Sequence, residues 1–224
     1  MLLEIKNIWH SDNLMAEAWD EALEMIQIDK EMFEEACDAF WVEDAEKLRK
    51  AIGKRDKVVN SIEREVRRKL LTHLSVQGTT NLAAGLTLST IIVDIERIGD
   101  TAKNMVTLAV YHPKAIKGET FNDELKKIEG HIKEQFVKLY QCIREGDEEL
   151  GAEIWEFHKE IKNRCEDILA RLVREKVEGM TTNTAAALAL YARYLKRINA
   201  HISNVASSVI NPFDRIGYKP KNEN

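Results

Sequence analysis

The chain has few of the residues that interrupt helices or cross-link a fold. Its 224 residues include three prolines, ten glycines and three cysteines, and aromatic residues make up 7%. So little proline and glycine allows long uninterrupted helices and argues against a fold of strands and turns. Cys37, Cys142 and Cys165 are far apart and form no CxxC pattern, so we expect reduced, packed thiols.

What is missing also excludes functional classes. The formal net charge of −5 argues against a general nucleic-acid binder, which is normally basic. No apolar run approaches the roughly 18–20 residues needed to cross a bilayer. The charged N-terminal run MLLEIK does not have the composition of a secretion signal. We therefore expect a cytoplasmic protein that buries part of its 44% hydrophobic residues in a core.

The most informative pattern present is an internal repeat. The repeated residues are Arg97-Ile98 with Arg197-Ile198, Asn104 with Asn204, and the run 79–84 (TTNLAA) with 181–186 (TTNTAA). The first two pairs are 100 residues apart and the runs are 102 apart, a two-residue difference that a duplicated unit would tolerate. A duplication of this length favours two copies of one domain. The copies differ, because Lys196 and Ala200 replace Glu96 and Asp100.

Hydrophobic periodicity predicts six long helices. Apolar residues recur every three to four positions in segments near 13–41, 44–78, 81–111, 123–143, 154–172 and 182–209. Asp44 is expected to cap the second helix, and Pro113 to stop the third. The fold class is all-α, with two tandem three-helix bundles over residues 1–115 and 120–212. Residues 213–224 form a polar tail that we expect to be loose, and helices of about 30 residues, each about 45 Å long, predict an elongated molecule.

The third segment carries a family signature. The run Asp94-Ile95-Glu96-Arg97-Ile98-Gly99-Asp100, followed by Asn104, resembles the signature of the PhoU family. The resemblance covers nearly the whole chain, because the duplicated three-helix layout and the charged second helix also match.

The resemblance implies a function that composition and spacing do not show. PhoU-like proteins are non-enzymatic cytoplasmic regulators of phosphate uptake, which link a phosphate transporter to a sensor histidine kinase that controls phosphate-starvation genes. Membrane association would then come only through partner proteins, since the chain has no span or basic amphipathic anchor. An apolar flank on a long bundle also leaves a homodimer open.

Acidic side chains form stripes on two neighbouring helices of the first repeat. Residues four apart lie about 40° apart around a helix axis, so Glu96 and Asp100 share a stripe. Asp56, Asn60 and Glu63, at i, i+4 and i+7, form another on the second helix, whereas Asp94 lies about 160° from Glu96 and is left out. If the helices pack side by side, the oxygen ligands of both stripes would suit Mg²⁺, Ca²⁺, Mn²⁺ or iron.

The resemblance also bears on this metal site. PhoU proteins hold metal clusters on paired carboxylate motifs of the second and third helices, and the matching residues here are Asp56, Asn60, Glu96 and Asp100. Asn60 departs from the family, where an acid is usual, and this should weaken metal binding. The second repeat has His158, Lys162, Lys196 and Ala200 in the corresponding stripe, and we expect no second metal site there.

A structural interpretation of the same residues remains open. The acids could form a solvated helix flank, with Glu63 in local ion pairs to Arg64 and Arg67. The paired arginines and asparagines of the repeat are expected to cover apolar surface or to tie neighbouring helices. The histidines, which have no HxxH or HExxH spacing, are expected to be packed or solvated.

Other functions are also compatible with the sequence. The chain could accompany a sodium–phosphate cotransporter, or it could be a metal-storage or metalloenzyme bundle. The usual Glu-x-x-His pairs of di-metal bundles are absent, as are a P-loop, a dinucleotide fingerprint and a nucleophile elbow. A scaffold that has kept the fold and lost phosphate regulation is the third alternative.

Overall fold

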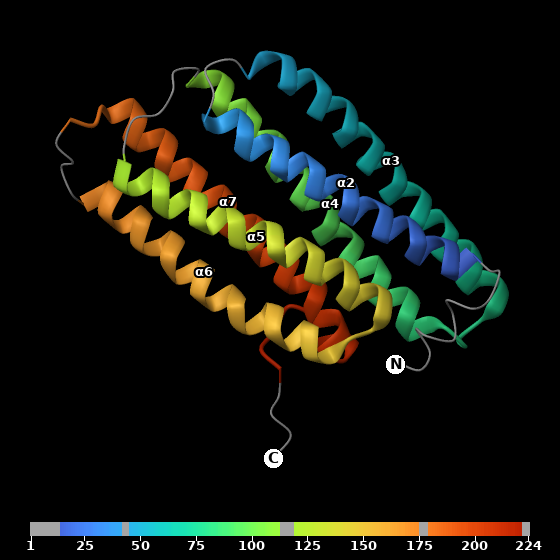
Figure 1. The fold of residues 1–224 in the computed structure, drawn as a ribbon. Helices are drawn as coiled ribbons and strands as arrows, with labels where there is room; N and C mark the ends of the chain where they lie inside the picture. The colour runs from blue at the N-terminus through green and yellow to red at the C-terminus, as the bar shows by residue number, and fades with distance from the viewer. Residues whose placement is uncertain (1–13, 42–44, 113–118, 175–178, 221–224) are drawn as a thin grey trace.

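The computed structural model confirms an all-α fold built from long helices (Figure 1). It describes residues 14–41, 45–112, 119–174 and 179–220, and these contain no strand. The helices are α2 (Leu14–Trp41), α3 (Glu46–Gln77), α4 (Leu82–Tyr111), α5 (Glu119–Glu145), α6 (Glu148–Arg174) and α7 (Thr182–Ile210), followed by the 3-10 turn η1 (Phe213–Arg215). The six long helices run side by side and give an elongated bundle, as Figure 1 shows.

Helix ends agree with the periodicity to within a few residues. The largest differences are at the starts of α6, which begins at Glu148 rather than near residue 154, and of α5, which begins at Glu119 rather than near residue 123. The predicted cap Asp44 lies outside the described residues, and Ala45 holds the N-cap position of α3 without a side-chain hydrogen bond. The matching acid of the second repeat does cap its helix, because the Leu150 amide donates to Asp147 Oδ1 at 3.0 Å.

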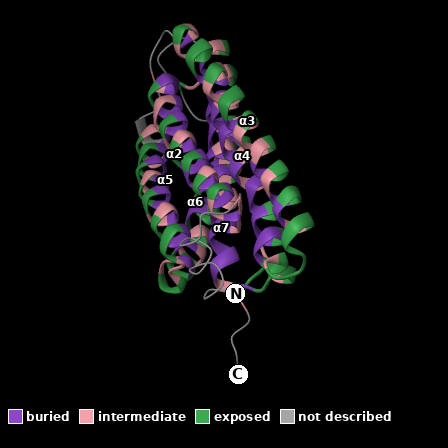
Figure 2. Ribbon diagram, turned by 90° about the vertical axis from the view of Figure 1, so that its right-hand side faces the viewer, coloured by how far each residue is buried: buried purple, intermediate pink, exposed green. Residues whose placement is uncertain are grey.

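The repeats meet through their third helices. α4 packs against α2, α3 and α7, and α7 packs against α4, α5 and α6, so this pair forms the centre of the bundle. Fifteen of the 30 residues of α4 are buried, against five of the 32 residues of α3, which places α3 at the periphery. Figure 2 shows the buried residues lining the inner helix faces, with exposed residues turned outward.

Buried positions give the register between the repeats. Phe33 on α2 and Phe136 on α5 are both fully buried and lie 103 residues apart. The spacing between α3 and α6 is 102 residues, as in Val59 and Ile161, and between α4 and α7 it is the 100 residues of the sequence echo. These pairs define which side chains occupy equivalent places in the two bundles.

The C-terminal segment is more ordered than predicted. Residues 213–220 fold back onto the end of α7, where the Gly217 amide donates to Ser207 Oγ at 2.7 Å. Asn211 Nδ2 also donates to the carbonyls of Arg215 and Tyr218, at 3.0 and 2.7 Å. The expectation of a loose tail was therefore wrong for these residues, because side-chain to backbone hydrogen bonds fasten a segment that has little apolar character.

Two expectations drawn from missing features agree with the structure. Cys37, Cys142 and Cys165 are all buried and unpaired, and burial raises the pKa of the Cys142 and Cys165 thiols to about 12. None of the helices in the described part of the chain has the length and apolar character to span a bilayer.

Candidate functional site

The acidic stripes of the first repeat converge in the structure. Asp56 on α3 and Asp100 on α4 are bridged by Lys103 of α4, whose Nζ lies 2.9 Å from Asp56 Oδ1 and 2.7 Å from Asp100 Oδ1. Glu96, one turn before Asp100, is half-buried and close enough to Asp56 to feel its charge. Asn60 is half-buried on α3, one turn after Asp56. Helix packing thus brings the three predicted acids into one cluster.

Two groups of the cluster, Glu96 and Lys103, have raised pKa values. Burial raises the pKa of the Glu96 carboxyl, and the charges of Glu63, Asp100 and Asp56 add to the effect. Burial acts to lower the pKa of the Lys103 ammonium, but its hydrogen bonds to Asp100 and Asp56 outweigh this and raise it. The Lys103 ammonium therefore neutralises only part of the negative charge of Asp56, Glu96 and Asp100.

A fourth carboxyl from α2 lies beneath the cluster. Asp29 is fully buried, and neither of its carboxylate oxygens has a hydrogen-bond partner. Burial raises the pKa of Asp29 well above its ordinary value, and the nearby charges of Glu96 and Asp56 add to this, so the site favours the protonated form of the carboxyl. A Cβ atom at Gly99 would lie only 2.5 Å from Asp29 Oδ1, so the glycine of the signature makes room for this acid.

The donor chemistry fits a hard divalent cation, although the arrangement does not yet form a coordination site. Asp56, Asn60, Glu96 and Asp100 supply only oxygen donors, which Mg²⁺, Ca²⁺ and Mn²⁺ prefer. Among the described residues, however, no three His, Cys, Asp or Glu side chains are grouped so as to hold a metal ion. The ammonium of Lys103 already lies between two of the carboxylates, so a metal would have to displace it.

In the second repeat, the positions equivalent to the acidic cluster carry other side chains. Asn199 stands where the first repeat has Gly99, and its buried amide nitrogen donates to the His158 carbonyl at 3.2 Å and lies 2.9 Å from His158 Nδ1. Lys196 Nζ pairs with Glu166 Oε1 at 2.6 Å. A lysine ammonium has no lone pair for a metal, and the absence of a second metal site stays an expectation.

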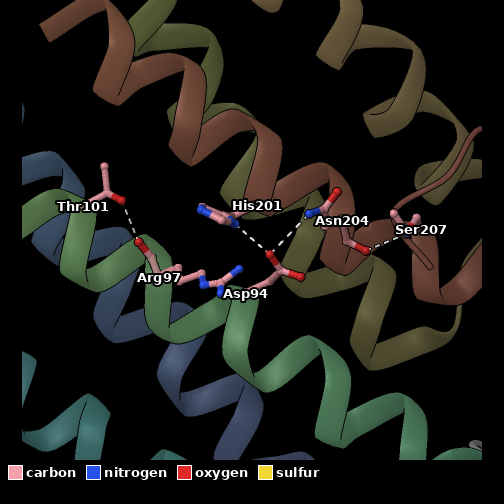
Figure 3. A network of polar contacts seen from close by, with 7 residues as sticks. Asp94, Arg97, Thr101, His201, Asn204 and Ser207 are labelled. Atoms are coloured by element: carbon pink, nitrogen blue, oxygen red, sulfur yellow. Dashed lines mark hydrogen bonds and ion pairs between the residues drawn. The ribbon is translucent and has the colours of Figure 1, made fainter. Parts of the chain in front are cut away.

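A polar network joins the third helices of the two repeats. His201 Nδ1 on α7 lies 2.7 Å from Asp94 Oδ1 on α4, and Asn204 Nδ2 donates to the same oxygen at 3.2 Å (Figure 3). Asp94 therefore faces α7 and not Glu96, as its angular position predicted. Asn204 ties neighbouring helices, as expected, whereas the pairing of His201 with Asp94 was not foreseen.

A second buried carboxylate joins the repeats at the other side of the junction. Glu129 Oε1 on α5 accepts hydrogen bonds from Trp41 Nε1 at 2.8 Å and from the Tyr191 hydroxyl at 2.7 Å. The ring of Tyr191 stacks on Phe40 of α2 with centroids 3.7 Å apart. Burial raises the pKa of Glu129, and the two hydrogen bonds act in the opposite direction. Residues of α2, in the first repeat, thus contact residues of α5 and α7, in the second repeat.

The fold defines a protein of two duplicated three-helix bundles. The acidic cluster of the first repeat is not retained in the second, where Lys196 and Ala200 replace Glu96 and Asp100. A model of the PhoU domain matches residues 22–109 and 125–209, one match in each repeat. The chain belongs to the PhoU domain family.

Known proteins agree with this membership. The chain is 25% identical over 170 residues to the phosphate-specific transport system accessory protein PhoU homolog 1 of Thermotoga maritima, covering 74% of this chain and 72% of that one. The crystal structure of PhoU from Pseudomonas aeruginosa has the same fold, with a TM-score of 0.80, 20% identity and coverage of 88% and 95%. The crystal structure of the phosphate transport system regulatory protein PhoU from Streptococcus pneumoniae also has this fold, with a TM-score of 0.77 and 13% sequence identity. The match covers 88% of this chain and 93% of that one.

Proposed function

We propose that this protein is a non-enzymatic regulator of phosphate uptake and phosphate-starvation signalling. The observation that supports the proposal most strongly is the family match in both repeats, since the duplicated architecture is retained over most of the chain. The names of the Thermotoga and Streptococcus relatives both refer to phosphate transport systems. In this proposal the protein acts in the cytoplasm as an adaptor, contacting a phosphate transporter on one side and a sensor histidine kinase on the other.

A strain that lacks the gene provides the test of this role. We expect phosphate uptake and a starvation reporter to remain high in phosphate-rich medium, and a plasmid copy of the gene to restore repression. Unchanged uptake and an unchanged reporter would contradict the proposal. If the excess uptake depended on sodium and the reporter did not change, the protein would instead accompany a sodium–phosphate cotransporter.

We also propose that the first repeat retains a weak cation site. Asp56, Asn60, Glu96 and Asp100 would be its ligands, and a divalent cation such as Mg²⁺ or Mn²⁺, or iron, would bind when it displaces Lys103. The proposal is supported by the convergence of three carboxylates and by the orphaned oxygens of Asp29 beneath them. Two features weaken the site, because Asn60 removes one negative charge and Lys103 competes for the carboxylates.

A further inference from the structure

The flank of the second repeat has a charge opposite to that of the first. The spacing of 102 residues between α3 and α6 places His158 and Lys162 at the positions of Asp56 and Asn60. The spacing of 100 residues between α4 and α7 places Lys196 at the position of Glu96. An acid or amide has thus been replaced by a basic side chain at three equivalent positions on the same scaffold.

Hydrogen bonding fixes the protonation of His158. The Asn199 amide nitrogen contacts both the His158 carbonyl and Nδ1, and because the carbonyl can only accept, this atom is the amide nitrogen and acts as a donor. Nδ1 must therefore be the acceptor, and the ring proton lies on Nε2. Asn199 is buried, so His158 is a neutral imidazole held in one tautomer with an N–H donor at Nε2.

Lysine ammonium groups surround this imidazole. Burial lowers the pKa of His158, a hydrogen bond with the Asn199 backbone acts in the opposite direction, and the charges of Lys162, Lys196 and Lys159 add to the lowering. Lys159 is paired with Glu156 of its own helix, at 2.8 Å. Lys162 is exposed, and no ion pair joins it to the described residues, although the Glu166 carboxylate one turn further along α6 lies within reach of its charge.

One carboxylate lies at the edge of the group. Glu166 accepts a hydrogen bond from Lys196, and this bond, followed by the charges of Lys196 and Lys162, lowers the Glu166 pKa although burial opposes the shift. The Glu166 side chain is an internal anion at the basic flank, just as Lys103 is an internal cation at the acidic flank of the first repeat. This contact shows that the Lys196 ammonium can pair with an anion.

We propose that His158, Lys162 and Lys196 form a binding site for a phosphate group, either inorganic phosphate or a phosphate monoester. Two ammonium groups supply charge-assisted donors, and the Nε2 proton of His158 supplies a neutral donor in a fixed direction. Phosphate offers several acceptor oxygens and up to two negative charges, so it can use all three donors at once, whereas one carboxylate has two oxygens and one charge. The site would bind phosphate whether or not the protein regulates phosphate transport.

Calorimetric titration of the full-length protein with inorganic phosphate at low ionic strength tests the site. We expect saturable binding that weakens about tenfold in the double variant Lys162→Gln/Lys196→Gln, since two charge-assisted donors are lost. Lys162 is exposed and Lys196 is half-buried, with its ammonium paired to Glu166, so circular dichroism is needed to check that the fold persists. The control Lys50→Gln/Lys54→Gln removes the same charge from α3 and should bind like the wild type. The variant Glu166→Gln should bind several-fold more tightly, because it removes the competing carboxylate.

Two further measurements test which phosphate compound binds and whether His158 Nε2 donates to it. A phosphoserine peptide is titrated beside inorganic phosphate, and whichever binds more tightly identifies the source of the phosphate group. The ¹⁵N signal of His158 Nε2 should shift on binding in the wild type and in the lysine control. Absence of saturable binding, equal losses in the double variant and the control, or acetate binding as well as phosphate would overturn the proposal.

Discussion

At the residue scale, the glycine of the family signature is explained by a buried acid. An ideal Cβ at Gly99 would lie 2.5 Å from Asp29 Oδ1, whereas nothing lies within 4 Å of one at Gly130. We expect Gly99→Ala to reduce the free energy of unfolding by about 1–3 kcal/mol in urea denaturation, because overpacking forces side chains or backbone to move. Gly130→Ala should be neutral or slightly stabilising.

A double-mutant cycle identifies the cause of that loss. Gly99→Ala should cost much less when it is introduced into Asp29→Ala than into the wild type, because the colliding carboxylate is gone. An equal cost in both backgrounds would mean that Gly99 is needed for some other reason.

The buried acid also predicts a pH dependence. Burial raises the pKa of Asp29, so above about pH 4 the unfolded chain loses a proton that the folded protein keeps. The contribution of Asp29 to the free energy of unfolding should therefore fall as pH rises, by up to about 1.4 kcal/mol per unit, until the folded pKa is reached. Asp29→Asn lacks this titration. The free energy of unfolding of the variant, relative to that of the wild type, should therefore increase steadily as the pH rises above about 4. If the difference in the free energy of unfolding between Asp29→Asn and the wild type did not change with pH, the raised pKa of Asp29 would be contradicted.

Sequence periodicity could predict much of the site but not all of it. Glu96 and Asp100 share a stripe by helical spacing alone, and their convergence with Asp56 required only that α3 pack beside α4. Lys103 was missed although it lies three residues after Asp100, because spacing does not show whether a long side chain reaches across to a neighbouring helix. Asp29 was missed because a single acid within an apolar stripe does not reveal its neighbours on other helices.

At the element scale, helix existence was easier to predict than helix ends. Long apolar stripes define α2 to α7, because each helix must bury one face. The fastening of residues 213–220 depends on local hydrogen bonds, such as those of Ser207 and Asn211, and these leave no periodic signal.

The cap of α6 gives a prediction at this scale. Asp147 Oδ1 accepts the Leu150 amide, one of the four amides that a helix start leaves without a backbone partner. Asp147→Ala should lower the free energy of unfolding by about 1 kcal/mol in thermal or urea denaturation. Asp147→Ser keeps a capping oxygen and should stay close to the wild type. Equal losses in the two variants would show that the side chain acts in another way.

At the scale of the whole molecule, the two repeats should unfold together. α4 packs against α7, and Asp94 is the acceptor for both His201 and Asn204 across this junction. Asp94→Ala leaves two largely buried polar groups without their partner, so we expect a loss of about 2–3 kcal/mol in the free energy of unfolding. The exposed Asp20→Ala is the matched control and should change stability by less than about 0.5 kcal/mol.

The number of transitions provides a separate check. Calorimetry should show one cooperative unfolding event in the wild type, because the repeats share buried surface. Two resolved transitions would show that each repeat folds independently and that the junction contributes little. Sedimentation of the same sample tests the homodimer that the sequence leaves open.

The duplicated scaffold carries opposite charges at equivalent places, and each flank is partly neutralised from within. Lys103 bridges carboxylates in the first repeat, and Glu166 pairs with Lys196 in the second. Since the carboxylates of the first repeat are engaged by Lys103, the account predicts cation binding that is weak in the wild type and stronger when the ammonium is removed.

Elemental analysis after incubation with Mg²⁺, Mn²⁺ and iron tests this account most directly. Lys103→Met keeps the length and the apolar stem of the side chain, and this variant should retain more metal than the wild type after desalting. Adding Glu96→Ala and Asp100→Ala to it should abolish the gain. Equal metal content in the wild type, in Lys103→Met and in the triple variant would contradict a cation site on the first repeat.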